Sequence, residues 1–168
     1  MIVNRQRNVR LARKPLEVFL LRVKKELGVE ESEVTICFVS DAEIAGMNER
    51  FRKKNGPTDV LSFPARNGGS ARSRKGEEIY TEGAKDTEST EKSLGRRRSR
   101  ATEVYLGDIA IAPETARRYA KKNGRSLNSE LRVLILHGVL HLLGYNHETD
   151  QGEMNRIEQK IRRRFGLA

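Results

Sequence analysis

The chain has 168 residues, a length that predicts one domain, and its 33 Lys and Arg against 23 Asp and Glu give a formal net charge of +10. Its longest apolar runs, such as residues 133–136, are far too short to span a membrane. Residues 1–10 carry charges but no apolar segment behind them, so we expect no secretory signal and a cytoplasmic protein. Cys37 is the only cysteine, which excludes an internal disulfide, and we expect it to be a buried, reduced thiol.

Strand and helix patterns alternate along the first part of the chain. The predicted elements are a strand over 1–4, a helix over 15–27, a strand over 33–39, a helix over 40–51 and a strand over 59–63. The first helix repeats its apolar residues with a helical period and meets a stop signal at Gly28. The second begins with a capping box, because the side chains of Ser40 and Glu43 can bond backbone amides of the first turn.

Residues 71–103 differ in composition from the rest of the chain. They hold nine Lys or Arg, seven Asp or Glu, eleven Ser, Thr or Gly and only six apolar residues, with no sustained period. Such a segment cannot bury enough apolar surface to offset its loss of conformational entropy, so we predict a disordered insertion. The other 135 residues keep 24 basic and 16 acidic groups, so the folded part is itself basic, which favours an anionic partner such as nucleic acid.

One strand and three helices are predicted after this insertion. They are a strand over 105–112, a helix over 113–122, an apolar helix over 128–143 and a last helix that ends near residue 165. Pro113 suits the first position of its helix, Gly144 ends the apolar helix, and residues 150–153 resemble a capping box for the last one. The strand residues expected to face the core are Leu106, Ile109 and Ile111. The element order predicts an α+β fold class, a single domain over 1–168 with one mixed β-sheet of about four strands packed with about five helices.

All three histidines of the chain fall within eleven positions, at His137, His141 and His147. The first two are four residues apart, so on a helix their rings lie on one face in adjacent turns. Gly144 then lets the chain turn back and bring the third histidine close. Three imidazoles leave a fourth coordination position open, which is typical of catalytic zinc. We therefore predict one Zn2+ per chain on the C-terminal helix and following loop, with nickel, cobalt or iron as alternatives.

The residue after the first histidine argues against a zinc protease. A zincin protease has the pattern His-Glu-x-x-His, in which the Glu is the general base, whereas this chain has Gly138 at that position. Zinc can still lower the pKa of a bound water to about 7 and polarise a phosphoryl oxygen. Together with the basic folded part, this favours a phosphodiester over a peptide as the substrate.

Three motifs, in order along the chain, make the sequence recognisable. They are Pro57-Thr58-Asp59-Val60-Leu61-Ser62-Phe63-Pro64 preceded by Asn48 and Arg52, then Leu106-Gly107-Asp108-Ile109, then His137-Gly138-x-Leu140-His141-Leu142-x-Gly144-Tyr145-x-His147. Together they resemble the signature of the YbeY family, the rRNA maturation factors described as metal-dependent single-strand endoribonucleases. The resemblance covers nearly the whole chain except residues 71–103.

This resemblance implies that His137, His141 and His147 bind the metal, usually taken as zinc. It also implies that Arg52 and His137 are catalytic, with Arg52 holding a phosphate or stabilising charge on it. The implied substrate is single-stranded RNA, the process is maturation of the 3′ end of 16S rRNA, and the partners are the small ribosomal subunit or its assembly factors. The chain departs from the family at Asn146, where an Asp is usual, because Asn accepts a hydrogen bond but carries no charge.

Several alternatives stay open from the residues alone. The protein is either this nuclease or chiefly a ribosome-assembly factor whose metal holds its C-terminal part together, and a metal-dependent hydrolase of a small substrate is a third reading. The attacking group is either water or the ribose 2′-OH. Asp108 is a carboxylate in a mostly apolar strand and would need partners if buried, whereas for Glu153 and Glu158 we expect surface pairing.

Overall fold

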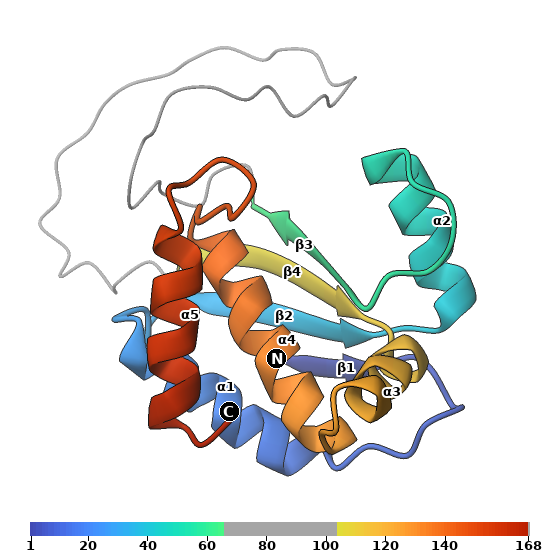
Figure 1. The fold of residues 1–168 in the computed structure, drawn as a ribbon, viewed down its shortest axis with the longest axis horizontal. Helices are drawn as coiled ribbons and strands as arrows, with labels where there is room; N and C mark the ends of the chain where they lie inside the picture. The colour runs from blue at the N-terminus through green and yellow to red at the C-terminus, as the bar shows by residue number, and fades with distance from the viewer. Residues whose placement is uncertain (66–103, 168) are drawn as a thin grey trace, which may run out of the picture.

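The computed structural model describes residues 1–65 and 104–167, so the predicted insertion at 71–103 lies outside the described residues. The described elements are β1 (Ile2–Asn4), α1 (Arg13–Glu26), β2 (Glu33–Phe38), α2 (Asp41–Arg52), β3 (Val60–Pro64), β4 (Tyr105–Ile111), α3 (Pro113–Lys122), α4 (Leu127–Leu142) and α5 (Glu153–Arg164) (Figure 1). None of the helices in these parts of the chain is long and apolar enough to cross a membrane.

The four strands form one mixed sheet in the order β1-β2-β4-β3. β1, β2 and β4 are parallel to one another, whereas β3 pairs antiparallel with β4 and forms one edge of the sheet. With five helices around this sheet, the predicted α+β class is confirmed. The antiparallel edge strand is important for the site, because it runs between α2 and the loop that follows α4 (Figure 1).

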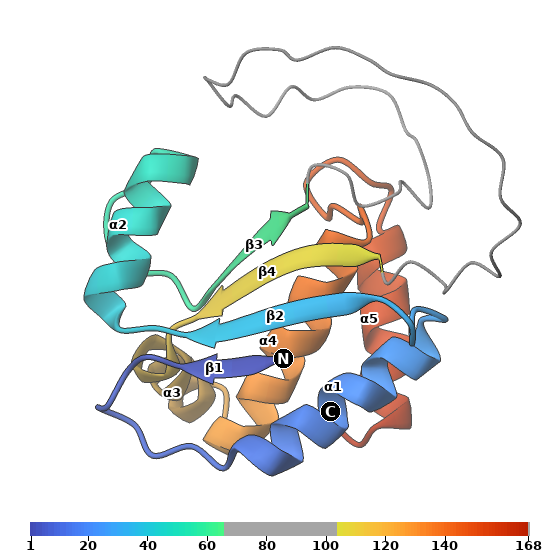
Figure 2. The same cartoon turned by 180° about the vertical axis from the view of Figure 1, so that it is seen from behind.

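The main core lies between one face of the sheet and the helices α1, α4 and α5, with the sheet in front of α4 in the reverse view (Figure 2). α4 is apolar almost all round and is the helix in contact with both α1 and α5. Its fully buried side chains include Ile135, Leu136, Val139 and Leu140. This burial fixes the rotation of α4 about its axis, and therefore the direction of its histidines.

β4 contains a bulge that explains why its core-facing residues do not alternate regularly along the strand. Leu106 is an extra residue at a register shift between β2 and β4, and such an insertion reverses the alternation of side chains along a strand. The bulge allows Leu106 to join Ile109 and Ile111 in the main core, as predicted from the sequence. Asp108 therefore points to the other face, where it is exposed and accepts a hydrogen bond of 2.6 Å from the Tyr105 hydroxyl. Asp108 is thus not a buried carboxylate.

A smaller cluster covers part of the opposite face of the sheet. Its members come from α2, β3, β4 and the ends of their neighbours, and they are Val39, Ile44, Leu61, Ala110 and Ala112, with Cys37, Met47 and Phe63 partly buried against them. The prediction that Cys37 is buried is wrong, since the thiol is only half-buried. The reason is that Cys37 faces away from α4 and lies at the margin of the area that this cluster covers.

The two predicted capping boxes have different outcomes. At the start of α2 the Ser40 hydroxyl accepts from the Glu43 amide at 3.2 Å, and the Glu43 carboxylate accepts from the Ser40 amide at 3.0 Å. At the start of α5 the predicted box is wrong, because the N-cap is Gly152, with a φ of 81° and no side-chain cap. Asp150 still accepts hydrogen bonds from the Gly152 amide (2.7 Å) and the Met154 amide (2.8 Å), so it stabilises the turn before the helix.

Candidate metal centre

The end of α4 places two histidines on one face and returns the chain toward them. His137 and His141 are one turn apart on α4, which ends at Leu142. Gly144 adopts a φ of +86°, a conformation that favours glycine, and the Tyr145 amide donates back to the Leu140 carbonyl at 3.1 Å. The following loop then brings His147 back beside the helix.

The three histidines can hold one metal ion. One ring nitrogen from each of His137, His141 and His147 lies within 4.8 Å of the other two. The Nε2 atoms of His137 and His141 are 3.1 Å apart, close to the ~3.3 Å that separates two ligand nitrogens around a tetrahedral zinc with bonds of about 2.0–2.1 Å. His147 is exposed, so the cluster opens toward solvent. The donor set and its spacing therefore suit a metal with an open coordination position.

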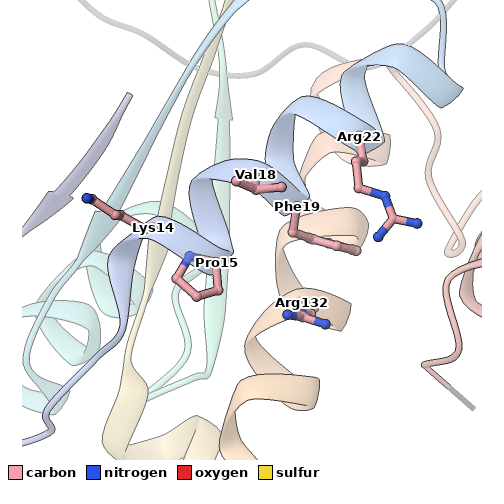
Figure 3. A pocket seen from close by; sticks show the side chains of 6 residues that line it. All are labelled: Lys14, Pro15, Val18, Phe19, Arg22 and Arg132. Atoms are coloured by element: carbon pink, nitrogen blue, oxygen red, sulfur yellow. The ribbon is translucent and has the colours of Figure 1, made fainter.

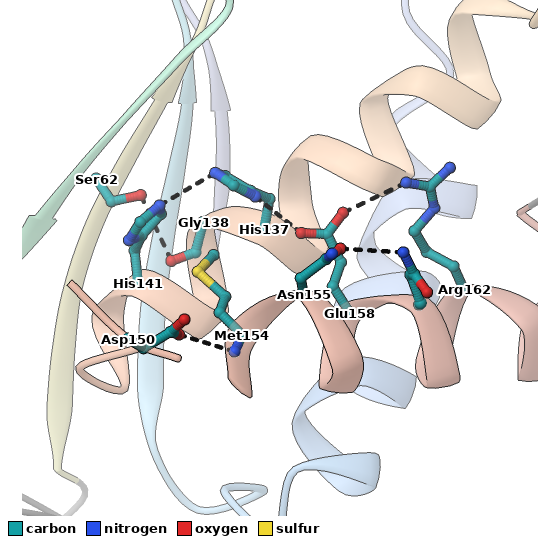
Figure 4. Close-up of polar contacts among 10 residues, drawn as sticks. Ser62, His137, Gly138, His141, Asp150, Met154, Asn155, Glu158 and Arg162 are labelled. Atoms are coloured by element: carbon teal, nitrogen blue, oxygen red, sulfur yellow. Dashed lines mark hydrogen bonds and ion pairs between the residues drawn. The ribbon is translucent and has the colours of Figure 1, made fainter. Parts of the chain in front are cut away.

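Glu158 of α5 orients the first histidine (Figure 4). Its Oε2 lies 2.9 Å from His137 Nδ1, and its Oε1 lies 3.5 Å from the Arg162 guanidinium. A carboxylate at Nδ1 holds the proton on that nitrogen, so the lone pair of Nε2 is free for a metal. This is the relation of a carboxylate to a metal-binding histidine that raises the basicity of the ligand.

The ionisation states match this role. Burial, together with the smaller effect of the neighbouring His137 and His147, lowers the pKa of His141 to about 4, so His141 is neutral at pH 7. Burial alone raises the pKa of Glu158, but the hydrogen bond and charge of His137 and the nearby Arg162 outweigh it, and the net pKa lies below its ordinary value. A neutral imidazole and an ionised supporting carboxylate are the forms that metal binding requires.

The role of Glu158 was missed in the sequence, where surface pairing was expected. A signal was present, because Met154 and Ile161 are buried on α5 and Glu158 falls between them at helical spacing. A carboxylate on the buried face of an amphipathic helix needs a partner. Glu153, the other acidic residue considered there, is the first residue of α5.

Replacing Glu158 with glutamine should weaken zinc binding by about 10- to 100-fold, because the uncharged amide holds the His137 ring less firmly. Competition with a coloured zinc chelator measures this affinity. Glu49→Gln, an exposed position on α2, is the matched control and should bind zinc as the wild type does. Equal zinc affinity in Glu158→Gln and the wild type would show that Glu158 does not support the ligand.

Arg52, the last residue of α2, reaches the loop that carries His147. Its Nη2 donates to Glu148 Oε1 at 3.2 Å, and both side chains are exposed. Glu148 follows His147 directly, so α2 contributes a cation at the margin of the histidine cluster. The structure therefore brings together all four residues singled out in the sequence.

Asn146 shapes the same loop. Its Oδ1 accepts a hydrogen bond from the Glu148 amide at 3.0 Å, and its carbonyl accepts from the Thr149 (3.1 Å) and Asp150 (2.8 Å) amides. An aspartate, which is usual at this position in the family that the motifs resemble, can accept the same side-chain hydrogen bond, so asparagine preserves this turn. The difference is that asparagine places no negative charge next to His147.

Other motif residues hold the surrounding backbone. Asn48 is buried and donates to the Gly56 carbonyl at 3.0 Å, which ties α2 to the turn before β3. Asp59 accepts from the Val60 amide at 3.0 Å and so caps the start of β3. The Ser62 hydroxyl lies 3.4 Å from the Gly138 carbonyl, which joins β3 to α4 beside His137 (Figure 4).

A hollow of about 370 Å³ lies elsewhere, between α1 and α4 (Figure 3). Its lining residues are Lys14, Pro15, Val18, Phe19, Arg22 and Arg132. A second hollow of about 480 Å³ lies beside β1, α1 and the start of β2. None of the three histidines lines either hollow, so the histidine cluster is separate from both.

Fold and site together define a mixed α+β domain with an open three-histidine centre at the end of its most apolar helix. Among known proteins, residues 2–166 match the family described as Endoribonuclease YbeY. A protein named Endoribonuclease YbeY from Koribacter versatilis is 36% identical over 99% of this chain and 86% of its own length. One of the same name from a Sulfurovum species is 35% identical over 80% of this chain and 74% of its own length. The chain therefore belongs to the YbeY endoribonuclease family, as its motifs suggested.

A solved structure supports the fold. The solution structure of a Thermotoga maritima protein matches with a TM-score of 0.55 and 23% sequence identity, covering 95% of this chain and 85% of that one. At this identity the likeness concerns the fold alone.

Proposed function

We propose that this protein is a zinc-dependent endoribonuclease that cuts single-stranded RNA during maturation of the 3′ end of 16S rRNA, in the cytoplasm and together with the small ribosomal subunit or its assembly factors. The observation that carries the proposal is the convergence of three imidazole nitrogens within 4.8 Å of one another, in a chain of the YbeY endoribonuclease family. The exposed Arg52 at the margin of this cluster adds a group that can bind phosphate.

A zinc ion on the three histidines would supply Lewis-acid chemistry, which activates water and polarises a phosphoryl oxygen. The chain's own residues then have distinct tasks. His137 presents Nε2 because Glu158 holds the proton on Nδ1. Arg52 exchanges its exposed bond to Glu148 for one to the scissile phosphate, and an exposed ion pair costs little to break.

Two features favour a polymer over a small molecule at this site. His147 and Arg52 are both exposed, so the centre is open to solvent. The formal net charge of +10 attracts a polyanion over a long range. A small substrate is usually enclosed, with most of its surface buried in a cleft.

A second candidate function is a ribosome-assembly factor with a structural metal. One observation favours it: the histidines and Glu158 connect α4, the following loop and α5, so a metal there would fasten the C-terminal elements together. The two functions differ in whether the zinc-loaded protein itself cuts RNA, and in whether folded variants of the histidine cluster lose function.

The test is the cleavage of a labelled single-stranded RNA by zinc-loaded protein and by Arg52→Ala. We expect the wild type to cut the single strand but not the same sequence in a duplex. Arg52→Ala should be slower by about 100-fold, the effect of removing one group that stabilises transition-state charge. Arg117→Ala, an exposed arginine of α3, is the matched control and should cut at the wild-type rate.

The product ends identify the attacking group. Water attack leaves a 5′-phosphate, and attack by the ribose 2′-OH leaves a 2′,3′-cyclic phosphate. A folded, zinc-loaded wild type that cuts neither free RNA nor RNA in small ribosomal subunits would reject the nuclease and favour the assembly factor. Equal rates for the wild type and Arg52→Ala would remove Arg52 from the site.

A further inference from the structure

Phe51, the next-to-last residue of α2, is a large apolar side chain in an unusual place. It is 58% exposed, although it lies between Arg50 and Arg52 at the margin of the metal centre. The adjacent smaller core cluster includes Ile44 and Met47 of α2, yet this ring stays outside it. A single exposed apolar residue needs no explanation by itself, so the case for a ligand depends on what holds this ring and on the charges around it.

The ring of Phe51 is held in position. It meets the ring of Phe63 edge to face, with centroids 5.1 Å apart and planes at 73°. Phe63 belongs to β3 and is half-buried against the smaller cluster, so it forms a firm support. The Arg50 guanidinium lies 5.4 Å from the Phe51 centroid, a distance at which a cation and an aromatic ring attract each other.

Each ring of this pair is adjacent in sequence to a residue at the margin of the metal centre. Phe51 precedes Arg52, which bonds Glu148 in the loop of His147. Phe63 follows Ser62, whose hydroxyl faces the Gly138 carbonyl beside the first histidine (Figure 4). Because neighbouring strand residues point to opposite faces, the ring pair and the histidines lie on the two sides of the edge strand β3.

The surrounding charge fits a nucleic-acid strand. Residues 50–54 have the sequence Arg-Phe-Arg-Lys-Lys, so four cations flank one aromatic ring. Arg52, Lys53 and Lys54 are all exposed, and Lys53 turns the chain with a φ of 55°. Alternation of cations with an exposed ring is the arrangement that binds phosphates and stacks bases in single strands.

We propose that Phe51, supported by Phe63, stacks one base of the RNA strand whose phosphate Arg52 holds at the metal centre. The proposal rests on the proposed function, and it adds a base-binding subsite across the edge strand. The subsite tolerates any base, because every base has an aromatic face. It requires an unpaired base, which gives a structural reason for cutting single strands only.

The test is equilibrium binding of short single-stranded RNAs to the full chain in a zinc chelator, so that no strand is cut. A series of RNAs carries one abasic nucleotide at successive positions. For the wild type, one position should weaken binding by about tenfold when its base is missing, the scale of one base–aromatic stack. Phe51→Ala should bind intact RNA about tenfold more weakly and lose this positional effect, whereas Phe51→Trp should retain both. Tyr119→Ala, which removes a 44% exposed ring from α3, is the control and should behave as the wild type.

The outcomes separate this subsite from the nuclease activity. If Phe51→Ala keeps the wild-type affinity or the wild-type positional effect, the stacking proposal is wrong, whether or not the protein cuts RNA. If an apolar peptide displaces RNA from the wild type but not from Phe51→Ala, and no abasic position matters, the ring serves a protein partner and the proposal is also wrong. If the positional effect depends on Phe51 but zinc-loaded protein cuts nothing, the subsite stands and the nuclease proposal fails.

Discussion

Replacing His141 with alanine should remove the bound zinc and slow RNA cleavage by about a thousandfold or more, equivalent to about 4 kcal/mol of transition-state stabilisation. His141 is the central residue of the histidine cluster, because its Nε2 is 3.1 Å from that of His137 and its ring centroid is 5.3 Å from that of His147. Its pKa of about 4, lowered by burial, makes it available to a metal throughout the neutral range. Zinc content per chain and initial cleavage rates measure the two effects.

The control for this variant is Thr149→Ala, which changes an exposed residue of the same loop. It should keep one zinc per chain and the wild-type rate. Circular dichroism and thermal unfolding of His141→Ala without metal establish that the variant is folded. Loss of zinc with undiminished cleavage would exclude the metal from the chemistry and leave it a structural role, whereas full zinc occupancy would show that the ligands lie elsewhere.

The elements of the fold followed from local signals in the sequence. Pro113 begins α3 and Ser40 caps α2 as expected, because each acts through bonds within its own first turn. The capping box expected at 150–153 did not form, since Gly152 takes a left-handed conformation and becomes the N-cap itself. The capping box and the observed turn both use the Asp150 carboxylate as a hydrogen-bond acceptor, and the sequence pattern alone does not distinguish the two arrangements.

The pairing of the strands, and the burial that depends on it, could not be predicted from the local sequence pattern. The edge position and antiparallel direction of β3 depend on pairing with β4, which lies across the segment that contains residues 71–103. The exposure of Asp108 depends on the bulge at Leu106, a feature of the pairing of β4 with β2. The prediction for Cys37 failed for a similar reason, because burial on that face depends on how far the smaller cluster extends.

The site was only partly predictable for the same reason. His137 and His141 are four residues apart on one helix, so their convergence could be predicted from helix geometry. The contact between Arg52 and Glu148 joins residues 96 positions apart, and the family motif rather than any periodicity pointed to Arg52. The support that Glu158 gives to His137 depends on how α5 docks on α4, which a pattern along one helix does not show.

Gly107→Ala should lower the free energy of unfolding by about 3 kcal/mol or more. Gly107 has a φ of +135°, which L side chains rarely adopt, and its backbone lies directly against the end of β3. A Cβ there would clash with the Phe63 carbonyl oxygen and lie 2.9 Å from the Ala65 nitrogen, so it is the backbone of β3 that must shift. Thermal unfolding should show a midpoint lower by about 10 °C.

Gly46→Ala is the matched control because it makes the same chemical change without a steric conflict. Gly46 lies within α2, and a Cβ there would meet nothing within 4 Å. Alanine is the better helix former by about 1 kcal/mol, so this variant should unfold at a slightly higher temperature than the wild type. The opposite signs expected of two Gly→Ala changes make the comparison independent of any general effect of the added methyl group. An unchanged midpoint for Gly107→Ala would mean that β3 yields freely to the new Cβ, and an edge strand that yields so easily could not hold Phe63 and Ser62 in fixed positions on its two sides.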